Sequence, residues 1–309
     1  MRIIEQNAVG GPEVLQVVDR DIPNPGPGEV RVKTGAASIN PVDAAIRAGY
    51  FPLLGEPPFS VGWDVAGTVD AVGEGVSLHL VGDRVFGMPR FPAAANAYAE
   101  YVIAPAEDLV ATPDVLDDEH AAAIPLVGLT AWLGLVHEGN VQPRQRVLIH
   151  AGGGGVGHLA VQIAKAKGAY VIATASPSKA EFVKGLGADE VIDYTAGDFA
   201  DGLDPVDLAF EPFGGDIATR SLAVVRDGGV LISLTAEPDE STAVEAKRRG
   251  IHALKINVAP DREALQALAD LAAAGTLVPH VSGVYPLEKA ADAHAELAGS
   301  TQGKIVLVP

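Results

Sequence analysis

The stretch that decides the fold runs from Val147 to Ala164, with the sequence VLIHAGGGGVGHLAVQIA. It begins with the apolar run Val147–Ile149, which is typical of a buried strand. Four consecutive glycines follow, and behind them apolar residues such as Val156, Leu159 and Ile163 recur at helical spacing. The stretch therefore predicts a strand, a glycine-rich turn and a helix in direct succession.

The glycines fit the spacing G-x-G-x-x-G, with Gly152, Gly154 and Gly157 as the three required positions. The first allows a tight turn, the second lets the backbone approach a pyrophosphate, and the third lets helix and strand pack closely. The helix beginning near Gly155 and Val156 would offer free N–H groups and a positive dipole end to phosphates. We interpret the loop as a dinucleotide site; the alternative is a flexible glycine turn without a ligand.

The end of the next expected strand bears on the choice between NADPH and NADH. An acidic residue there usually bonds the ribose 2′-hydroxyl of NAD. Here the strand is followed by hydroxyl side chains such as Ser176 and by Lys179, and the first carboxylate is Glu181. These groups suit a 2′-phosphate, so the sequence favours NADPH. The alternative for Lys179 is a solvated lysine at the start of a helix.

Helix-length patterns alternate with short apolar runs from about Ala121 onward. That alternation favours an α/β fold, a doubly wound parallel sheet with helices on both faces. The first third has short strands between turn signals, which indicates a mostly β module. Because 309 residues are many for one core, we expect two domains. The expected strands are Val30–Val32, Val65–Val69, Arg84–Phe86, Val147–Ile149, Tyr170–Ala173, Glu190–Ile192, Asp207–Phe210, Val230–Leu234 and Lys304–Val308, and the expected helices include Glu263–Ala274 and Ala290–Leu297.

Composition excludes several classes of function. The formal charge of −18 repels nucleic acid phosphates and anionic lipid, although solubility alone also explains it. The absence of cysteine excludes disulfides and thiolate metal sites, and none of the eight histidines pairs at H-x-x-x-H spacing. No signal-peptide pattern and no bilayer-spanning apolar run is present. We expect a cytoplasmic protein that binds neither nucleic acid nor membrane.

Four polar residues outside the loop are open to two interpretations. Asn40 precedes Pro41 and is typical of an N-cap that begins a helix. Asn40 and Tyr50 could instead lie on the wall of a cleft, and the same choice applies to Tyr98 and Thr130. Spacing alone favours the structural interpretation. No Gly-x-Ser-x-Gly motif supports acyl transfer.

Taken in order, these motifs resemble the medium-chain dehydrogenase/reductase superfamily, and specifically its zinc-independent quinone oxidoreductase branch, which is zeta-crystallin-like. The resemblance spans nearly the whole chain. It rests on Asn40-Pro41-Val42-Asp43 with Arg47-Ala48-Gly49, Gly62-Trp63-Asp64-Val65-Ala66-Gly67, Val81-Gly82-Asp83-Arg84-Val85, Tyr98-Ala99-Glu100-Tyr101, Gly128-Leu129-Thr130-Ala131-Trp132, the loop 152–157, Leu186-Gly187-Ala188-Asp189 and Gly303-Lys304-Ile305-Val306-Leu307.

The resemblance implies a GroES-like, mostly β catalytic domain joined to a Rossmann domain. Residues 1–122 would begin the catalytic domain, residues 123–258 would form the NADPH-binding domain, and residues 259–309 would return to the first. The active site would lie in the cleft between them, and the protein would be a homodimer.

The resemblance also implies that the protein holds no metal. Zinc-dependent relatives place a cysteine where this chain has Asn40, and His-Glu where it has Trp63 and Asp64. Their structural zinc lobe with four cysteines is absent as well. Both zinc sites are therefore expected to be missing.

Individual cofactor roles follow from the resemblance. One departure weakens the NADPH preference, because some relatives end with an arginine that touches the 2′-phosphate, and this chain ends Val308-Pro309. The implied cofactor contacts are Thr130 near the nicotinamide, Gly154, Gly155 and Val156 at the pyrophosphate, Ser176 and Lys179 at the 2′-phosphate, Tyr194 on the adenosine side, and Asn40 in the cleft.

The expected activity is hydride transfer from NADPH to a quinone or a similarly activated carbonyl acceptor, with Asn40, Tyr50 and Tyr98 near the acceptor. Without a Lewis acid, the acceptor must already be electron-poor. Two alternatives stay open: a reductase of the double bond of enones or enals, and a non-catalytic NADPH-binding or sensor protein.

Overall fold

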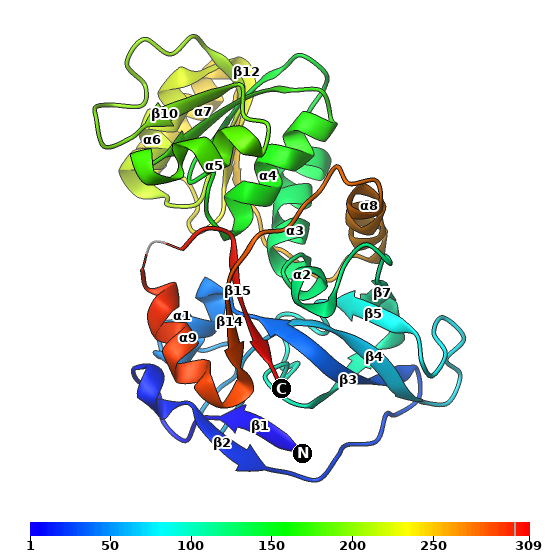
Figure 1. The fold of residues 1–309 in the computed structure, drawn as a ribbon. Coiled ribbons are helices and arrows are strands. Elements are labelled where there is room, and N and C mark those ends of the chain that lie inside the picture. The colour runs from blue at the N-terminus through cyan, green and yellow to red at the C-terminus, as the bar shows by residue number, and fades with distance from the viewer. Residues whose placement is uncertain (300) are drawn as a thin grey trace. The chain divides into compact units, whose positions relative to one another are not determined.

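The computed structural model describes residues 1–299 and 301–309 and divides the chain into two compact units (Figure 1). Unit 1 comprises Met1–Leu129 and Ala259–Pro309, and unit 2 comprises Thr130–Val258. The helix α3 (Pro125–Trp132) continues without a break across the division between residues 129 and 130.

Unit 2 is built on a six-stranded sheet in the order β10-β9-β8-β11-β12-β13, and every neighbouring pair is parallel. Helices form most of the crossovers between these parallel strands, and a loop without a helix connects β10 to β11. This confirms the predicted Rossmann sheet. Its strands are β8 (Arg146–Ile149), β9 (Tyr170–Ala175), β10 (Glu190–Asp193), β11 (Val206–Glu211), β12 (Val225–Ser233) and β13 (His252–Lys255), and its helices are α4 (Gly155–Ala166), α5 (Ala180–Gly185), α6 (Gly215–Val224) and α7 (Glu240–Arg249).

The central strands of unit 2 explain its apolar sequence runs. Val147, Leu148 and Ile149 of β8 have no exposed surface, because helices cover both faces of a parallel sheet. Leu148 packs in one cluster with Ile172 of β9 and Leu231 of β12. Burial of each such side chain stabilises the fold by about 1.5–3 kcal/mol.

Unit 1 contains a seven-stranded sheet, in which six strands follow the order β14-β15-β3-β4-β5-β7 and β6 pairs with β3. The strands β1 and β2 form a separate antiparallel pair. The last strand of the chain therefore lies between β14 and β3, which joins the C-terminal segment to the N-terminal one. This confirms the expected GroES-like domain. Its strands are β1 (Arg2–Glu5), β2 (Gln16–Asp19), β3 (Glu29–Ser38), β4 (Asp64–Val72), β5 (Arg84–Gly87), β6 (Tyr101–Pro105), β7 (Leu109–Ala111), β14 (Val281–Pro286) and β15 (Lys304–Val308).

Helices of unit 1 pack on several strands of this sheet. Throughout residues 1–299 and 301–309, no helix has the length and apolar character that a bilayer crossing requires. The helices of this unit include α1 (Pro41–Arg47), α2 (Asp118–Ala122), α8 (Arg262–Ala273) and α9 (Ala290–Leu297), with the helical turns η1 (Pro12–Val14), η2 (Ala106–Asp108) and η5 (Leu287–Lys289). Unit 2 also contains the helical turns η3 (Leu133–Glu138) and η4 (Pro177–Lys179).

Candidate functional site

The glycine loop of unit 2 lies between the carboxyl end of β8 and the first residue of α4, as the motif predicts. The Gly152 amide donates to the Thr174 carbonyl at 2.9 Å, and the Gly154 amide donates to the Ala151 carbonyl at 2.9 Å. Gly154 is the N-cap of α4 and has no side chain with which to cap it. The loop thus leads directly into a helix N-terminus, which favours bound phosphate.

Two of the motif glycines are required by close packing. A Cβ at Gly157 would lie 2.1 Å from the Ala151 carbonyl oxygen, and one at Gly152 would lie 2.9 Å from the Ala173 Cβ. Neither position has room for a side chain. The first and third glycines of the motif therefore do what the spacing predicts, and the loop meets the steric conditions for a dinucleotide site.

A pocket of about 330 Å³ opens beside this loop within unit 2. It is framed by the carboxyl ends of β8, β9, β10 and β11. Four of the predicted cofactor residues are among its lining, and the described lining residues include no carboxylate. They are His150, Ala151, Gly153, Gly154, Thr174, Ala175, Ser176, Lys179, Tyr194, Gly197, Phe199, Phe213, Ile217 and Arg220.

Lys179 supplies positive charge to this pocket. Its aliphatic stem passes over the loop, since a Cβ at Gly153 would lie 3.0 Å from the Lys179 Cδ. Partial burial lowers the pKa of its ammonium group from the ordinary value. Ser176 stands at the N-terminal side of the same turn, and its hydroxyl lies 3.0 Å from that of Ser178. The cation and the hydroxyls together form the kind of site that binds a phosphate monoester.

The pocket also contains residues that sequence reasoning missed. His150 follows β8 directly; its Nδ1 lies 3.2 Å from the Thr174 hydroxyl and its Nε2 lies 2.9 Å from the Ser221 hydroxyl. Burial, with a smaller effect of the nearby Arg220 cation, lowers the pKa of this imidazole to about 4. His150 is therefore neutral at neutral pH and ties β8 to β9 and α6. Its position at the carboxyl end of a buried strand was the available signal.

Arg220 and two phenylalanines complete the missed set. The Arg220 guanidinium pairs with Asp198 at 2.5 Å and lies over the Phe199 ring, 4.7 Å from its centroid. The Phe199 ring in turn meets His150 edge-on at 4.5 Å. Phe213 is 58% exposed and Tyr194 is 55% exposed, so two accessible aromatic rings belong to this pocket. No spacing rule in the sequence connects residues from such different loops.

In unit 1, the structure places Asn40 inside the fold. It is the N-cap of α1, and its backbone N–H donates to the Asp43 carboxylate at 2.8 Å, as a capping box does. Its side-chain oxygen accepts a bond from Lys304 at 2.5 Å, and its amide nitrogen donates to Asp64 at 2.8 Å. Asn40 has no exposed surface. Both functional atoms of its carboxamide are thus already bonded within unit 1.

Tyr98 is also fully buried. Its hydroxyl donates to Asp43 at 2.8 Å and lies 3.1 Å from Nε2 of His294. Burial raises the pKa of Tyr98 well above its ordinary value and raises that of Asp43 to about 7. Burial, with the nearby Arg47 cation, lowers the pKa of His294 to about 3.

The three expected acceptor residues differ in exposure. Tyr50 is 86% exposed, whereas Asn40 and Tyr98 share the buried carboxylate of Asp43. Asn40 and Tyr98 both bond to Asp43 in the first turn of α1. Their contact with an acceptor stays a prediction. Thr130 is a buried residue of α3, at the first position of unit 2.

The positions at which zinc-dependent relatives have metal ligands carry other side chains in this chain. Trp63 is buried; its indole N–H donates to the Ala93 carbonyl at 2.7 Å, and its ring meets Phe91 edge-on at 5.1 Å. Asp64 accepts bonds from Ser38 and from Asn40. Within the described part of the chain, no three His, Cys, Asp or Glu side chains are grouped as a metal site requires.

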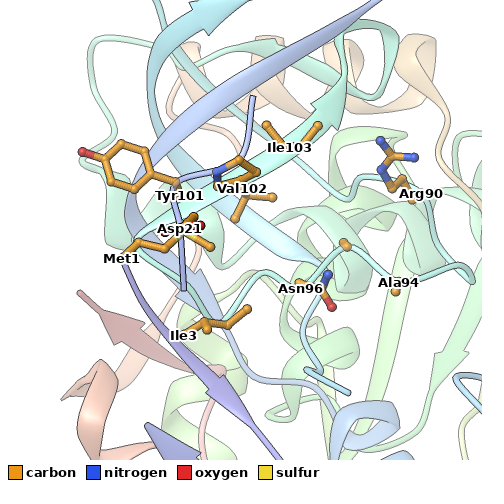
Figure 2. Close-up of a pocket in the computed structure, with 11 residues that line it drawn as sticks. Met1, Ile3, Asp21, Arg90, Ala94, Asn96, Tyr101, Val102 and Ile103 are labelled. Carbon is orange, nitrogen blue, oxygen red and sulfur yellow. The ribbon is translucent and has the colours of Figure 1, made fainter. Parts of the chain in front are cut away.

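A second pocket, also of about 330 Å³, lies in unit 1 beside β1 and β6 (Figure 2). Ile3, Val102 and Ile103 contribute an apolar lining, and Arg90 and Asp21 contribute charge. The Arg90 guanidinium is already bonded to the Glu29 carboxylate. This pocket lacks a glycine loop and a helix N-terminus, so the pocket of unit 2 is the better candidate for a cofactor.

Comparison with known proteins supports the fold assigned to each unit. Residues 26–114 match the family described as alcohol dehydrogenase GroES-like domain, and residues 186–307 match the family described as zinc-binding dehydrogenase. A quinone oxidoreductase of Sus scrofa is 35% identical, covering 97% of this chain and 95% of that protein. A 2-haloacrylate reductase of a Burkholderia species is 35% identical, covering 97% and 96%. The structure of Escherichia coli quinone oxidoreductase complexed with NADPH superposes with a TM-score of 0.91 at 31% identity, covering both chains completely.

A Rossmann sheet with a GroES-like domain, and relatives of this identity over the full length, define the class of protein. The chain belongs to the zinc-independent quinone oxidoreductase branch of the medium-chain dehydrogenase/reductase superfamily, and it is an oxidoreductase enzyme. This confirms the resemblance drawn from the motifs.

Proposed function

We propose that this protein is an NADPH-dependent reductase that transfers hydride to a quinone. The observation that carries the proposal is the pocket of unit 2, where Lys179 and Ser176 stand beside the glycine loop and no carboxylate lines the described wall. The E. coli relative, crystallised with NADPH, supports the same cofactor.

The chain would hold the cofactor at three places. The loop amides and the start of α4, around Gly154, Gly155 and Val156, would take the pyrophosphate. Lys179 and Ser176 would take the 2′-phosphate. Tyr194 and Phe213 offer accessible aromatic surface for the adenine ring. When bound, NADPH supplies the hydride that reduces the acceptor.

The residues of this chain would bind and orient the cofactor and the acceptor, and they would exclude water from the reaction. Trp63 and Asn40 replace the metal ligands of zinc-dependent relatives, and both are committed to hydrogen bonds inside unit 1. The acceptor must therefore already be electron-poor, as a quinone is. Among the expected acceptor residues, Tyr50 is the one with an accessible side chain, so we assign it an acceptor contact.

A second candidate is reduction of an activated carbon–carbon double bond, favoured by the 2-haloacrylate reductase relative. The third is binding of NADPH without turnover. The test follows NADPH absorbance with purified protein and three acceptor panels: quinones, enones and 2-haloacrylates. Rapid loss with quinones alone supports the proposal, and loss with enones or haloacrylates alone supports the second candidate. Tight NADPH binding without turnover on any panel would support the third and overturn the proposal.

A further inference from the structure

Lys304 is a buried lysine of unit 1 that the proposed function does not use. It is the first residue of β15 and is only 3% exposed. Its ammonium donates to the Ile39 carbonyl at 2.6 Å and to the Asn40 side-chain oxygen at 2.5 Å, and it lies 3.7 Å from the Asp64 carboxylate. Burial lowers its pKa, whereas the two nearby carboxylates act in the opposite direction.

The Lys304 ammonium fixes the orientation of the Asn40 carboxamide. An ammonium group donates and does not accept, so the oxygen of the carboxamide must face it. The amide nitrogen is thereby directed at Asp64, to which it donates at 2.8 Å. With an apolar residue at position 304, the carboxamide oxygen would lose its donor, and the bond to Asp64 alone would hold the group in this orientation.

Asp64 connects the Asn40 side chain to the helix α3. One carboxylate oxygen accepts bonds from Ser38, at 2.6 Å, and from Asn40. The other accepts the backbone N–H of Leu126, at 2.8 Å, in the first turn of α3. Thr130 lies one turn later in the same helix. A continuous set of bonds therefore runs from Lys304 through Asn40 and Asp64 to the start of α3.

The charge of Lys304 also balances that of Asp64. Asp64 has no exposed surface, and removal of one partner of a buried pair leaves an uncompensated charge that disturbs its surroundings. Without the Lys304 charge, the Asp64 carboxylate would bind water or another donor, and its bond to the Leu126 N–H would weaken.

We propose that Lys304 is a positioning residue of the reductase: through Asn40 and Asp64 it fixes the first turn of α3 and hence the place of Thr130. The role in catalysis rests on the proposed function, because Thr130 is expected beside the nicotinamide. The effect on α3 does not rest on it. A small displacement of a positioned group lowers the rate without an equal loss of binding.

The test compares Lys304→Met with Lys289→Met, a control that removes an exposed lysine of unit 1 paired with Asp292. Hydrogen exchange of the intact protein measures the order of α3. Lys304→Met should speed exchange in the peptide that covers residues 125–132, and Lys289→Met should not. Unchanged exchange in this peptide would overturn the proposal, whether or not the protein proves to be a quinone reductase.

Kinetics then test the catalytic part, with NADPH and the best acceptor of the panels. Lys304→Met should lower kcat by about tenfold or more, with the Kd for NADPH and the KM for the acceptor nearly unchanged. The double variant Lys304→Met/Asp64→Asn removes both charges; it should recover Tm but not kcat, because Asn40 still lacks its donor. Recovery of kcat together with Tm would show that Lys304 only balances charge and would overturn the proposal. The double variant also serves if the single variant fails to fold.

Discussion

At the residue level, the proposed preference for NADPH over NADH depends on the cations of the unit 2 pocket. These are Lys179 and Arg220, and Arg220 pairs with Asp198 and Asp216. A chain with 40 acidic and 22 basic residues provides little background attraction for an additional phosphate. Local positive charge in the pocket is therefore what would favour NADPH over NADH.

Replacement of Lys179 tests this role. Lys179→Ala should weaken NADPH binding by about tenfold or more, the scale of one charge-assisted hydrogen bond of about 1.5–3 kcal/mol. NADH binding should change by less than about threefold, because NADH lacks the 2′-phosphate. Titration calorimetry of both cofactors measures the difference. Lys184→Ala, which removes an exposed lysine of α5 paired with Glu181, is the matched control; equal losses for NADPH and NADH in Lys179→Ala would contradict the assignment.

The neutral state of His150 should make stability depend on pH. Its pKa is about 4 in the folded protein, against 6.5 for an ordinary histidine. Between these values the unfolded chain takes up a proton that the folded chain does not, so stability falls as the pH is lowered, by up to about 3 kcal/mol. Asp43, with its raised pKa, acts in the opposite sense and is unaffected by substitution at position 150.

His150→Gln keeps hydrogen-bonding groups but removes this titration. Urea unfolding at about pH 7 and about pH 5 should show a smaller loss of stability for His150→Gln than for the unmodified chain. The same loss in both proteins would mean that His150 is not held neutral by the fold.

The sequence could not predict which side chains from distant segments meet in the site. Lys179 and Ser176 were predictable because they follow one strand directly. Phe213 and Arg220 reach the pocket from other strands and helices, and no local pattern indicates that. Asn40 accepts a bond from Lys304, which is more than two hundred residues away in the chain and is brought near by the pairing of β15 with β3.

At the level of secondary structure elements, the turn from β8 into α4 should tolerate no side chain at its third glycine. In Gly157→Ala the new methyl group would lie 2.1 Å from the Ala151 carbonyl oxygen. We expect a loss of stability of about 1–3 kcal/mol from overpacking and loss of NADPH binding, measured by thermal unfolding and by titration. Gly185→Ala in α5, where nothing lies within 4 Å of the new Cβ, should be nearly neutral in both measurements. Full NADPH binding by Gly157→Ala would contradict the role of the loop.

Elements with strong local patterns were predicted closely. The expected strand Lys304–Val308 and the expected helix Ala290–Leu297 have the bounds that the structure gives to β15 and α9. Apolar runs and helical spacing specify such elements locally. Short strands of mixed polarity, such as β2 (Gln16–Asp19) and β13 (His252–Lys255), were not singled out. Their pairing depends on partners elsewhere in the chain, which a local pattern does not contain.

At the level of the whole molecule, the Rossmann sheet of unit 2 ends on the short strand β13, which has one neighbour, β12, among the described strands. An open sheet edge of this kind can pair with a second copy of the chain. We predict a homodimer, with a mass of twice 31.7 kDa, by light scattering after size exclusion. A monomer mass at micromolar concentration would contradict this prediction.

The identity of the cofactor is the claim on which the proposed function depends, and titration of the intact protein with NADPH and NADH tests it most directly. With Lys179 and Ser176 beside the glycine loop, NADPH should bind at least about tenfold more tightly than NADH. Equal affinity for the two cofactors, or tighter binding of NADH, would contradict it.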